Sequence, residues 1–233
     1  MKRENPWLNL LGLATLIMIP VSLWAIFIYA PIEKTMGVVQ KIFYYHVPSA
    51  WIAFLAFFIV FLSSILFLWQ RDKKWDNLAY SAAELGVVFC SLVLITGPIW
   101  AKPAWNVWWT WDVRLTTTLV LWLVYVAYLI LRNYTSEGYQ RGRFAAVFGI
   151  IGFVNVPLVF MSIRWWERKQ HPNPVILGKP GSGLEPAMLL TLIISLVAFT
   201  LLFFYLLPQR LRLENMKDEL GEIKEEIMES MER

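Results

Sequence analysis

The sequence predicts an all-α integral membrane protein, a bundle of six transmembrane helices with both termini in the cytoplasm. Hydrophobic residues make up 58% of its 233 residues and charged residues only 16%, whereas a soluble domain carries about 25% charged residues. Six apolar stretches are also long enough to cross a bilayer, which takes roughly 17–25 residues. Because a segment in lipid must satisfy its own backbone hydrogen bonds, stretches of this length are expected to be helices.

The six predicted spans form one membrane domain over residues 1–208. The first span begins after Lys2 and Arg3, as a signal peptide would. Its apolar run exceeds the ~7–15 residues of a signal-peptide core, so we expect it to be retained. In order, the predicted spans are 7–30, 47–69, 78–100, 115–131, 144–163 and 187–207.

Glu84, in the third span, is the one charged residue inside the six predicted spans. An ionisable residue within a membrane helix favours a functional role. Glu84 would then contact a partner helix or line a polar pocket. The alternative is that its side chain reaches back to the nearby inner interface. The sequence itself indicates no partner for it.

The distribution of basic residues sets the expected orientation. Six spans place both termini on one side, and that side has thirteen Lys and Arg residues against eight on the other. The positive-inside rule therefore predicts that both termini are cytoplasmic. The outer loops still carry a net charge of +4, which would attract an anionic ligand.

The composition changes after Pro208, and residues 209–233 are predicted to form a cytoplasmic amphipathic tail helix. Apolar residues recur there at spacings of three and four between Glu and Lys residues. They are Leu213, Met216, Leu220, Ile223 and Ile227. This heptad-like pattern is typical of a solvated or membrane-surface helix and equally of a helix that binds a partner.

The segment between the third and fourth spans is unusually rich in tryptophan. Five tryptophans fall within twelve residues, namely Trp100, Trp105, Trp108, Trp109 and Trp111. They provide far more aromatic surface than a turn needs, which suits a large, flat, apolar ligand. The alternative is an interfacial belt, but a belt is spread over several helices and this run lies in one loop.

The chain holds only two histidines, His46 and His171. The expected topology places both on the outer side, together with the tryptophan-rich loop. Imidazole is a good axial ligand for haem iron, and two imidazoles would fill both axial positions. The combination indicates haem. The alternatives are that His46 only caps the second helix beside Pro48 and that His171 is merely exposed in a proline-rich loop.

Other chemistry is not indicated. Cys90 is the only cysteine and lies inside the third span, so no intrachain disulfide can form. Motifs for covalent haem attachment, phosphate binding, zinc binding and serine catalysis are absent from the sequence. We therefore expect no enzymatic activity and no nucleic-acid partner, and the one partner that composition requires is membrane lipid.

Three segments resemble motifs of one family. Residues 105–116 resemble the tryptophan-rich WWD motif of haem-handling proteins. Residues 43–51, around His46, resemble the first histidine motif of the cytochrome c maturation protein C (CcmC) family. The residues Trp165-Trp166 followed by His171-Pro172 resemble the second histidine motif of the same family. The chain departs from that family in having Asn106 where glycine is usual, a more charged spacer at 167–170 and a longer tail.

The resemblance implies a function and a site. The protein would bind haem b non-covalently at the periplasmic face of a bacterial inner membrane. It would deliver the haem to a membrane-anchored haem chaperone for c-type cytochrome biogenesis, in a complex with ABC transporter subunits. The expected site comprises the axial ligands His46 and His171 and six further residues, Trp105, Trp108, Trp109, Trp111, Asp112 and Arg114.

The charged residues of this site have more than one expected role. Arg114, with Arg164 or Arg168, is a candidate for binding the haem propionates, since arginine pairs well with carboxylates. Arg114 could equally pair with Asp112. Asp112 is expected to shape the loop.

Two other functions are compatible with the sequence. One is a b-type electron-transfer membrane subunit with two histidine ligands. Such subunits usually hold haem within the bundle, whereas His46 lies at a helix edge and His171 in a loop, which favours an open site. The other is a haem-free channel or transporter with the tryptophan loop as a gate.

Overall fold

The computed structural model describes residues 6–34, 36–134, 139–165 and 184–231. Within these ranges the chain is helical apart from short connections and one isolated bridge between Glu33 and Gly37. The elements are α1 (Pro6–Trp24), the π-helical turn η1 (Ala25–Tyr29), the 3-10 turn η2 (Val38–Ile42), α2 (Phe43–Gln70), α3 (Lys73–Trp105), α4 (Val113–Tyr134), α5 (Tyr139–Phe153), α6 (Asn155–Trp165) and α7 (Pro186–Met231).

Six of the described helical segments are long and apolar enough to span a membrane, which confirms the predicted fold class. The fifth span is formed by α5 and α6 together, with a break at Val154. Pro157 explains this break, because its ring clashes with the carbonyl group four residues earlier, at Phe153. The six segments are Pro6–Tyr29, Val38–Gln70, Lys73–Pro103, Val113–Tyr134, Tyr139–Ser162 and Pro186–Met231.

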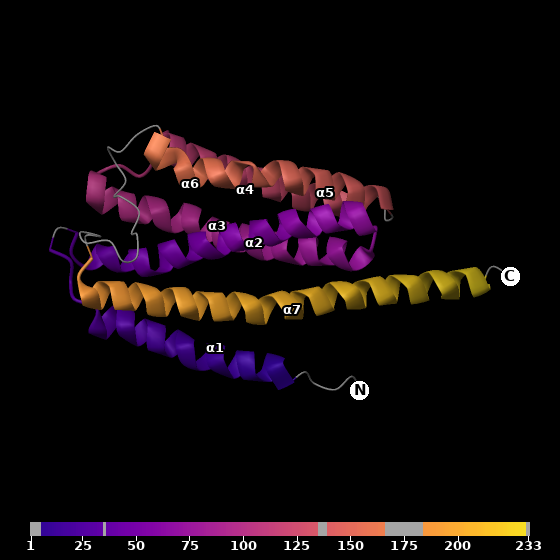
Figure 1. Ribbon diagram of the computed structural model, residues 1–233, viewed down its shortest axis with the longest axis horizontal. Helices are drawn as coiled ribbons and strands as arrows, with labels where there is room; N and C mark the ends of the chain where they lie inside the picture. The colour runs from indigo at the N-terminus through magenta and orange to yellow at the C-terminus, as the bar shows by residue number, and fades with distance from the viewer. Residues whose placement is uncertain (1–5, 35, 135–138, 166–183, 232–233) are drawn as a thin grey trace.

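The helices run side by side along the long axis of the molecule (Figure 1). Helices α4, α5 and α6 form one flank, α2 and α3 the middle, and α7 the other flank, with α1 packed outside α7. The start of α1 and the end of α7 lie toward the same end. We call this the tail end, and the opposite end, with residues 30–34, 36–42 and 106–112, the loop end.

The core lies where α2 packs against α3, α4 and α5. The Phe57 and Tyr125 rings stack there at 3.7 Å between centroids, and both side chains are fully buried. Gly86 of α3 makes this contact possible, because a Cβ at that position would lie only 2.5 Å from the Phe57 ring. Close approach through small residues is a usual way for membrane helices to pack.

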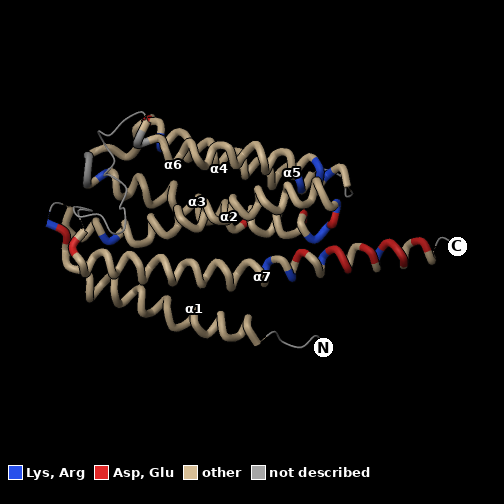
Figure 2. Tube along the Cα trace, in the orientation of Figure 1, with Lys and Arg blue, Asp and Glu red and all other residues tan. Residues whose placement is uncertain are grey.

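Charged residues gather at the two ends of the bundle and along the last part of α7 (Figure 2). Glu84 lies in the half of α3 that is nearer the tail end. Its side chain forms an ion pair with Arg210 of α7, a partner that the sequence did not reveal. Arg210 also pairs with Glu214 at 3.0 Å.

A second ion pair lies beside this one at the tail end. The Arg132 side chain of α4 is 2% exposed and pairs with Asp76 of α3. The Tyr80 ring lies 4.5 Å from the Arg132 guanidinium and 5.2 Å from that of Arg210. The two pairs therefore form one polar network that joins α3, α4 and α7.

The predicted sixth span and tail form one continuous helix. Helix α7 passes Pro208 without a break and ends at Met231. The apolar tail residues are 47–64% exposed, while a different side of the helix contacts the start of α3. There Asn77 donates hydrogen bonds to Asn215 and Asp218, and Lys73 pairs with Asp218 at 3.3 Å.

Candidate functional site

Some of the predicted site lies outside the described parts of the structure. His171 and Arg168 fall in the undescribed segment between α6 and α7. Trp105 is the last residue of α3, but its side chain is not described, and the same holds for the Arg164 side chain in α6. The described part of the site consists of His46 and residues 106–114.

His46 lies in the first turns of α2, at the loop end. Helix α2 begins at Phe43 after Ile42, which makes no side-chain cap, so His46 does not cap this helix. Its half-buried side chain contacts α3 instead. The imidazole Nδ1 lies 2.9 Å from Oγ1 of Thr96, and that hydroxyl donates to the Leu92 carbonyl oxygen at 2.6 Å.

A packed aromatic base supports His46. Trp100 of α3 is 7% exposed, and its ring centre lies 6.1 Å from the His46 ring and 6.1 Å from the Phe43 ring. Side chains of η1 and α7 complete this cluster, including Ile26, Met188 and Leu192. Trp100 is therefore a core residue, distinct from the tryptophans of the loop that follows it.

Asn106 ends helix α3 and begins the tryptophan loop. Its backbone is left-handed, with φ of 58°, and its N–H donates to the Lys102 carbonyl oxygen at 2.9 Å. Glycine is the usual residue at such a helix end, and asparagine is the side chain that most often replaces it. Asn106 thus supplies a left-handed turn of the kind that usually requires glycine.

The loop tryptophans differ in exposure. Trp108 is 59% and Trp111 75% exposed. Trp109 is less exposed and meets the Trp111 ring edge to face, at 5.7 Å between centroids. Its indole N–H is buried and has no hydrogen-bond partner among the described residues. The loop therefore presents two open aromatic rings and one buried donor.

Asp112 closes the loop by capping α4. Its carboxylate accepts hydrogen bonds from the Leu115 backbone N–H at 3.0 Å and from the Thr110 hydroxyl at 2.7 Å. Such a cap satisfies one of the unpaired N–H groups at a helix start. The role of Asp112 in the structure is thus to shape the loop.

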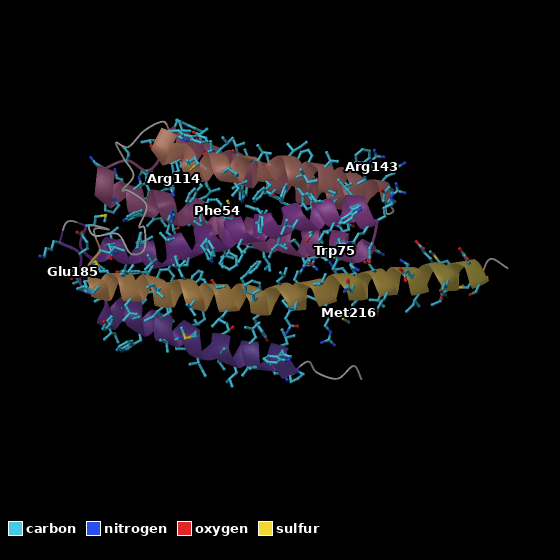
Figure 3. All side chains as sticks on the ribbon, in the orientation of Figure 1. Phe54, Trp75, Arg114, Arg143, Glu185 and Met216 are labelled. Carbon is cyan, nitrogen blue, oxygen red and sulfur yellow. The ribbon has the colours of Figure 1, made fainter. Side chains whose placement is uncertain are left out.

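Arg114 lies in the first turn of α4, near the loop end of the bundle (Figure 3). Within the described residues no ion pair joins it to Asp112, whose two carboxylate oxygens accept the hydrogen bonds that cap α4 and shape the loop. Its guanidinium therefore remains a candidate for binding an anion.

Helix α3 connects the two halves of the described site. It contacts His46 through Thr96 and Trp100, and its end leads directly into the tryptophan loop. Sequence reasoning missed Thr96. The only local signal was the neighbouring Gly97-Pro98 pair within an apolar span, and nothing in it pointed to a histidine 50 residues earlier.

Comparison with known proteins finds similarity over nearly the whole chain. Residues 1–226 match the model of a family described as heme exporter protein C. The heme exporter protein C of Bradyrhizobium diazoefficiens is 34% identical over 201 residues, 86% of this chain and 74% of that protein. The protein of the same name from Escherichia coli K12 is 34% identical over 210 residues, 89% of this chain and 82% of its own. That of Haemophilus influenzae is 31% identical over 212 residues, 90% and 85% of the two chains.

Proposed function

The chain belongs to the heme exporter protein C (CcmC) family, and we propose that it binds haem b at the periplasmic face of a bacterial inner membrane and delivers it to a haem chaperone for c-type cytochrome biogenesis. The observation that carries this proposal is the arrangement at the loop end. An oriented imidazole, that of His46, projects from the helix pair whose end leads into a loop of exposed tryptophan rings.

The described residues fit the chemistry of haem. Haem offers an iron atom, a flat apolar ring and anionic propionates. Imidazole nitrogen is a usual ligand of haem iron, so His46 could bind the iron atom. The exposed rings of Trp108 and Trp111 could contact the flat ring of haem, because aromatic rings stack on flat apolar surfaces. The Arg114 guanidinium and the buried indole N–H of Trp109 could donate hydrogen bonds to the propionates.

His171 and Trp105 complete the proposed site. His171 would supply the second axial ligand, so that the iron has one imidazole on each face. Iron with two strong axial ligands has no open position for oxygen, which favours holding haem over activating oxygen. In this proposal haem is cargo, held non-covalently, and the protein performs no catalysis of its own.

The orientation follows from charge. By the expected topology the side with both termini has thirteen Lys and Arg residues and the loop-end side eight. The loop end is therefore periplasmic and the tail end cytoplasmic. The net charge of +4 on the outer loops suits a ligand with two carboxylates.

The proposed partners are a membrane-anchored haem chaperone and the ABC transporter subunits of a cytochrome c maturation complex. The similar proteins are named for haem export, which is the process in which these partners would act. The open rings of Trp108 and Trp111 also favour docking of a second protein, because an exposed apolar patch is unfavourable in water.

A transfer experiment tests the proposal. The chain is purified in detergent, loaded with haem and mixed with the haem-free, affinity-tagged soluble domain of the chaperone. We expect low-spin haem in the chain and movement of that haem to the chaperone after the two are separated. Haem that binds but never moves would indicate an electron-transfer subunit. Failure of the chain to bind haem at all would refute the proposal.

A further inference from the structure

We propose that Thr96 is a positioning residue for His46. Its hydroxyl holds the imidazole with the proton on Nδ1, so that the lone pair on Nε2 is the one presented to haem iron. The role of this arrangement in haem binding rests on the proposed function. The orientation and tautomer of His46 are inferred separately, from the contacts between α2 and α3.

The hydrogen bonds of Thr96 fix the direction of donation. A threonine hydroxyl has one hydrogen to donate and two lone pairs that accept. Its oxygen lies 2.6 Å from the Leu92 carbonyl oxygen, which can only accept. The single hydrogen therefore goes to Leu92. The contact of 2.9 Å with His46 must then be a hydrogen bond that Nδ1 donates and Thr96 accepts.

This direction sets the tautomer of His46. A neutral imidazole carries one N–H group, and its other nitrogen holds the lone pair that binds a metal. With the hydrogen on Nδ1, the lone pair is on Nε2. A partner at one ring nitrogen is the usual way in which proteins select the nitrogen that ligates metal at the other.

Helix α3 also limits rotation of the ring. A Cβ atom at Gly97 would lie 3.5 Å from Cε1 of His46, so the edge of the ring from Nδ1 to Cε1 faces this helix. Trp100, one turn beyond Thr96, packs near the ring at an interplanar angle of 49°. Thr96 and Gly97 thus lie against one edge of the imidazole, and Trp100 packs close to the ring.

A hydroxyl is a suitable partner for a histidine that must later release its haem. A carboxylate at Nδ1 would raise the basicity of the imidazole and strengthen its bond to iron. A neutral hydroxyl, whose own hydrogen is given to a backbone carbonyl, orients the ring with a smaller electronic effect. The pairing with Thr96 therefore favours a ligand that is well oriented and still able to release haem.

The tautomer can be measured without haem. The chain has only two histidines, so protein labelled with ¹⁵N-histidine gives two sets of imidazole signals by NMR, and His171→Ala identifies those of His46. We expect the Nδ1–H form to dominate in the wild type and in Thr96→Ser, and to lose population in Thr96→Val. A dominant Nε2–H form in the wild type would overturn the proposal.

Haem titration of the same variants gives the second readout. Loss of a partner of this kind costs about 10- to 100-fold in metal affinity, so we expect Thr96→Val to bind haem that much more weakly and to show more high-spin iron. Thr96→Ser should restore both. In a His46→Ala background Thr96→Val should have no further effect.

The outcomes separate the two proposals. If His46→Ala changes the haem spectrum and Thr96→Val does not, the role of Thr96 is refuted and the proposed function stands. An equal loss of affinity from Thr96→Val with and without His46 would show that Thr96 acts through helix packing, and would also refute its positioning role. If His46→Ala leaves haem binding unchanged, His46 is not a ligand and both fail.

Discussion

Asn106 illustrates how a single backbone conformation sets the direction of the tryptophan loop. Its φ of 58° turns the chain out of α3 two residues before Trp108. Its side chain accepts a hydrogen bond from Lys102 Nζ at 3.0 Å, and Lys102 also donates to its backbone oxygen at 3.1 Å. The loop therefore starts from a turn that is fixed by both backbone and side chain.

We predict that Asn106→Ala destabilises the protein by about 1 kcal/mol relative to Asn106→Gly, because a left-handed backbone penalises a Cβ atom. Both variants lose the bond from Lys102 to Oδ1, so the difference between them isolates the backbone. Reversible unfolding in mixed detergent micelles measures it. Equal stabilities of the two variants would show that the turn relaxes.

The aromatic rings of the tryptophan loop give a second prediction about single residues. Trp108→Ala or Trp111→Ala should lower haem affinity roughly 2- to 10-fold, since one aromatic stacking contact contributes about 0.5–1.5 kcal/mol. The double variant should lose about the product of the two effects, and chaperone co-purification should fall with it.

The matched control is Trp69→Ala. Trp69 is 79% exposed, as open as the loop rings, but it lies at the end of α2 beside the tail end. We expect it to bind haem like the wild type. If the double loop variant also behaves like the wild type, the loop is an interfacial anchor and the platform assignment is wrong.

Between elements, the polar network at the tail end fixes α7 against α3 and α4. Arg132 is almost fully buried, and the side chain of its partner Asp76 is 10% exposed. Charges this deeply buried are stabilising only as a pair, because each alone retains its desolvation cost. We therefore expect the loss of one partner to destabilise the bundle more than the intact pair stabilises it.

We predict that Asp76→Asn destabilises the bundle by about 3–5 kcal/mol, since it leaves the Arg132 charge without its main partner. The double variant with Arg132→Met should recover much of that loss. Lys74→Ala is the control, because Lys74 and Asp72 form an exposed pair at 2.7 Å, and such pairs contribute at most about 1 kcal/mol. Thermal unfolding in detergent compares the three, and equal effects of Asp76→Asn and Lys74→Ala would contradict this account.

For the whole molecule, the fold was predictable because hydrophobicity alone dictates the spans. Six long apolar stretches in lipid have no alternative to helices. The pairing of Glu84 with Arg210 was not predictable, because it depends on which helices become neighbours. Thr96 escaped notice for the same reason. The change of composition after Pro208 predicts where the apolar span gives way to the amphipathic tail, but it does not reveal that both lie in one continuous helix, α7.

The candidate site was predictable only in part. His46 and the tryptophan loop were identified from residue type and motif, and the structure places both at the loop end. The sequence could not distinguish the buried Trp100 from the open Trp108 and Trp111, since exposure depends on where α3 ends. His171 stays a prediction, because it lies outside the described residues.

The orientation of the whole molecule gives a further prediction. A reporter that works only outside the cytoplasm should be active when fused after Trp111, in the tryptophan loop, and silent when fused after Asp72, between α2 and α3. A cytoplasmic reporter should give the reverse pattern. An active fusion after Asp72 with a silent one after Trp111 would place the loop end in the cytoplasm and invert the proposed topology.

The absorption spectrum of purified protein tests the central claim most directly. We predict low-spin haem in the wild type, and loss of haem or conversion to high-spin iron in both His46→Ala and His171→Ala, while each variant still inserts in the membrane. Added imidazole should restore part of the low-spin signal by filling the vacant axial position. Wild-type haem content and spectrum in both variants would contradict ligation by the two histidines and the function proposed for the loop end.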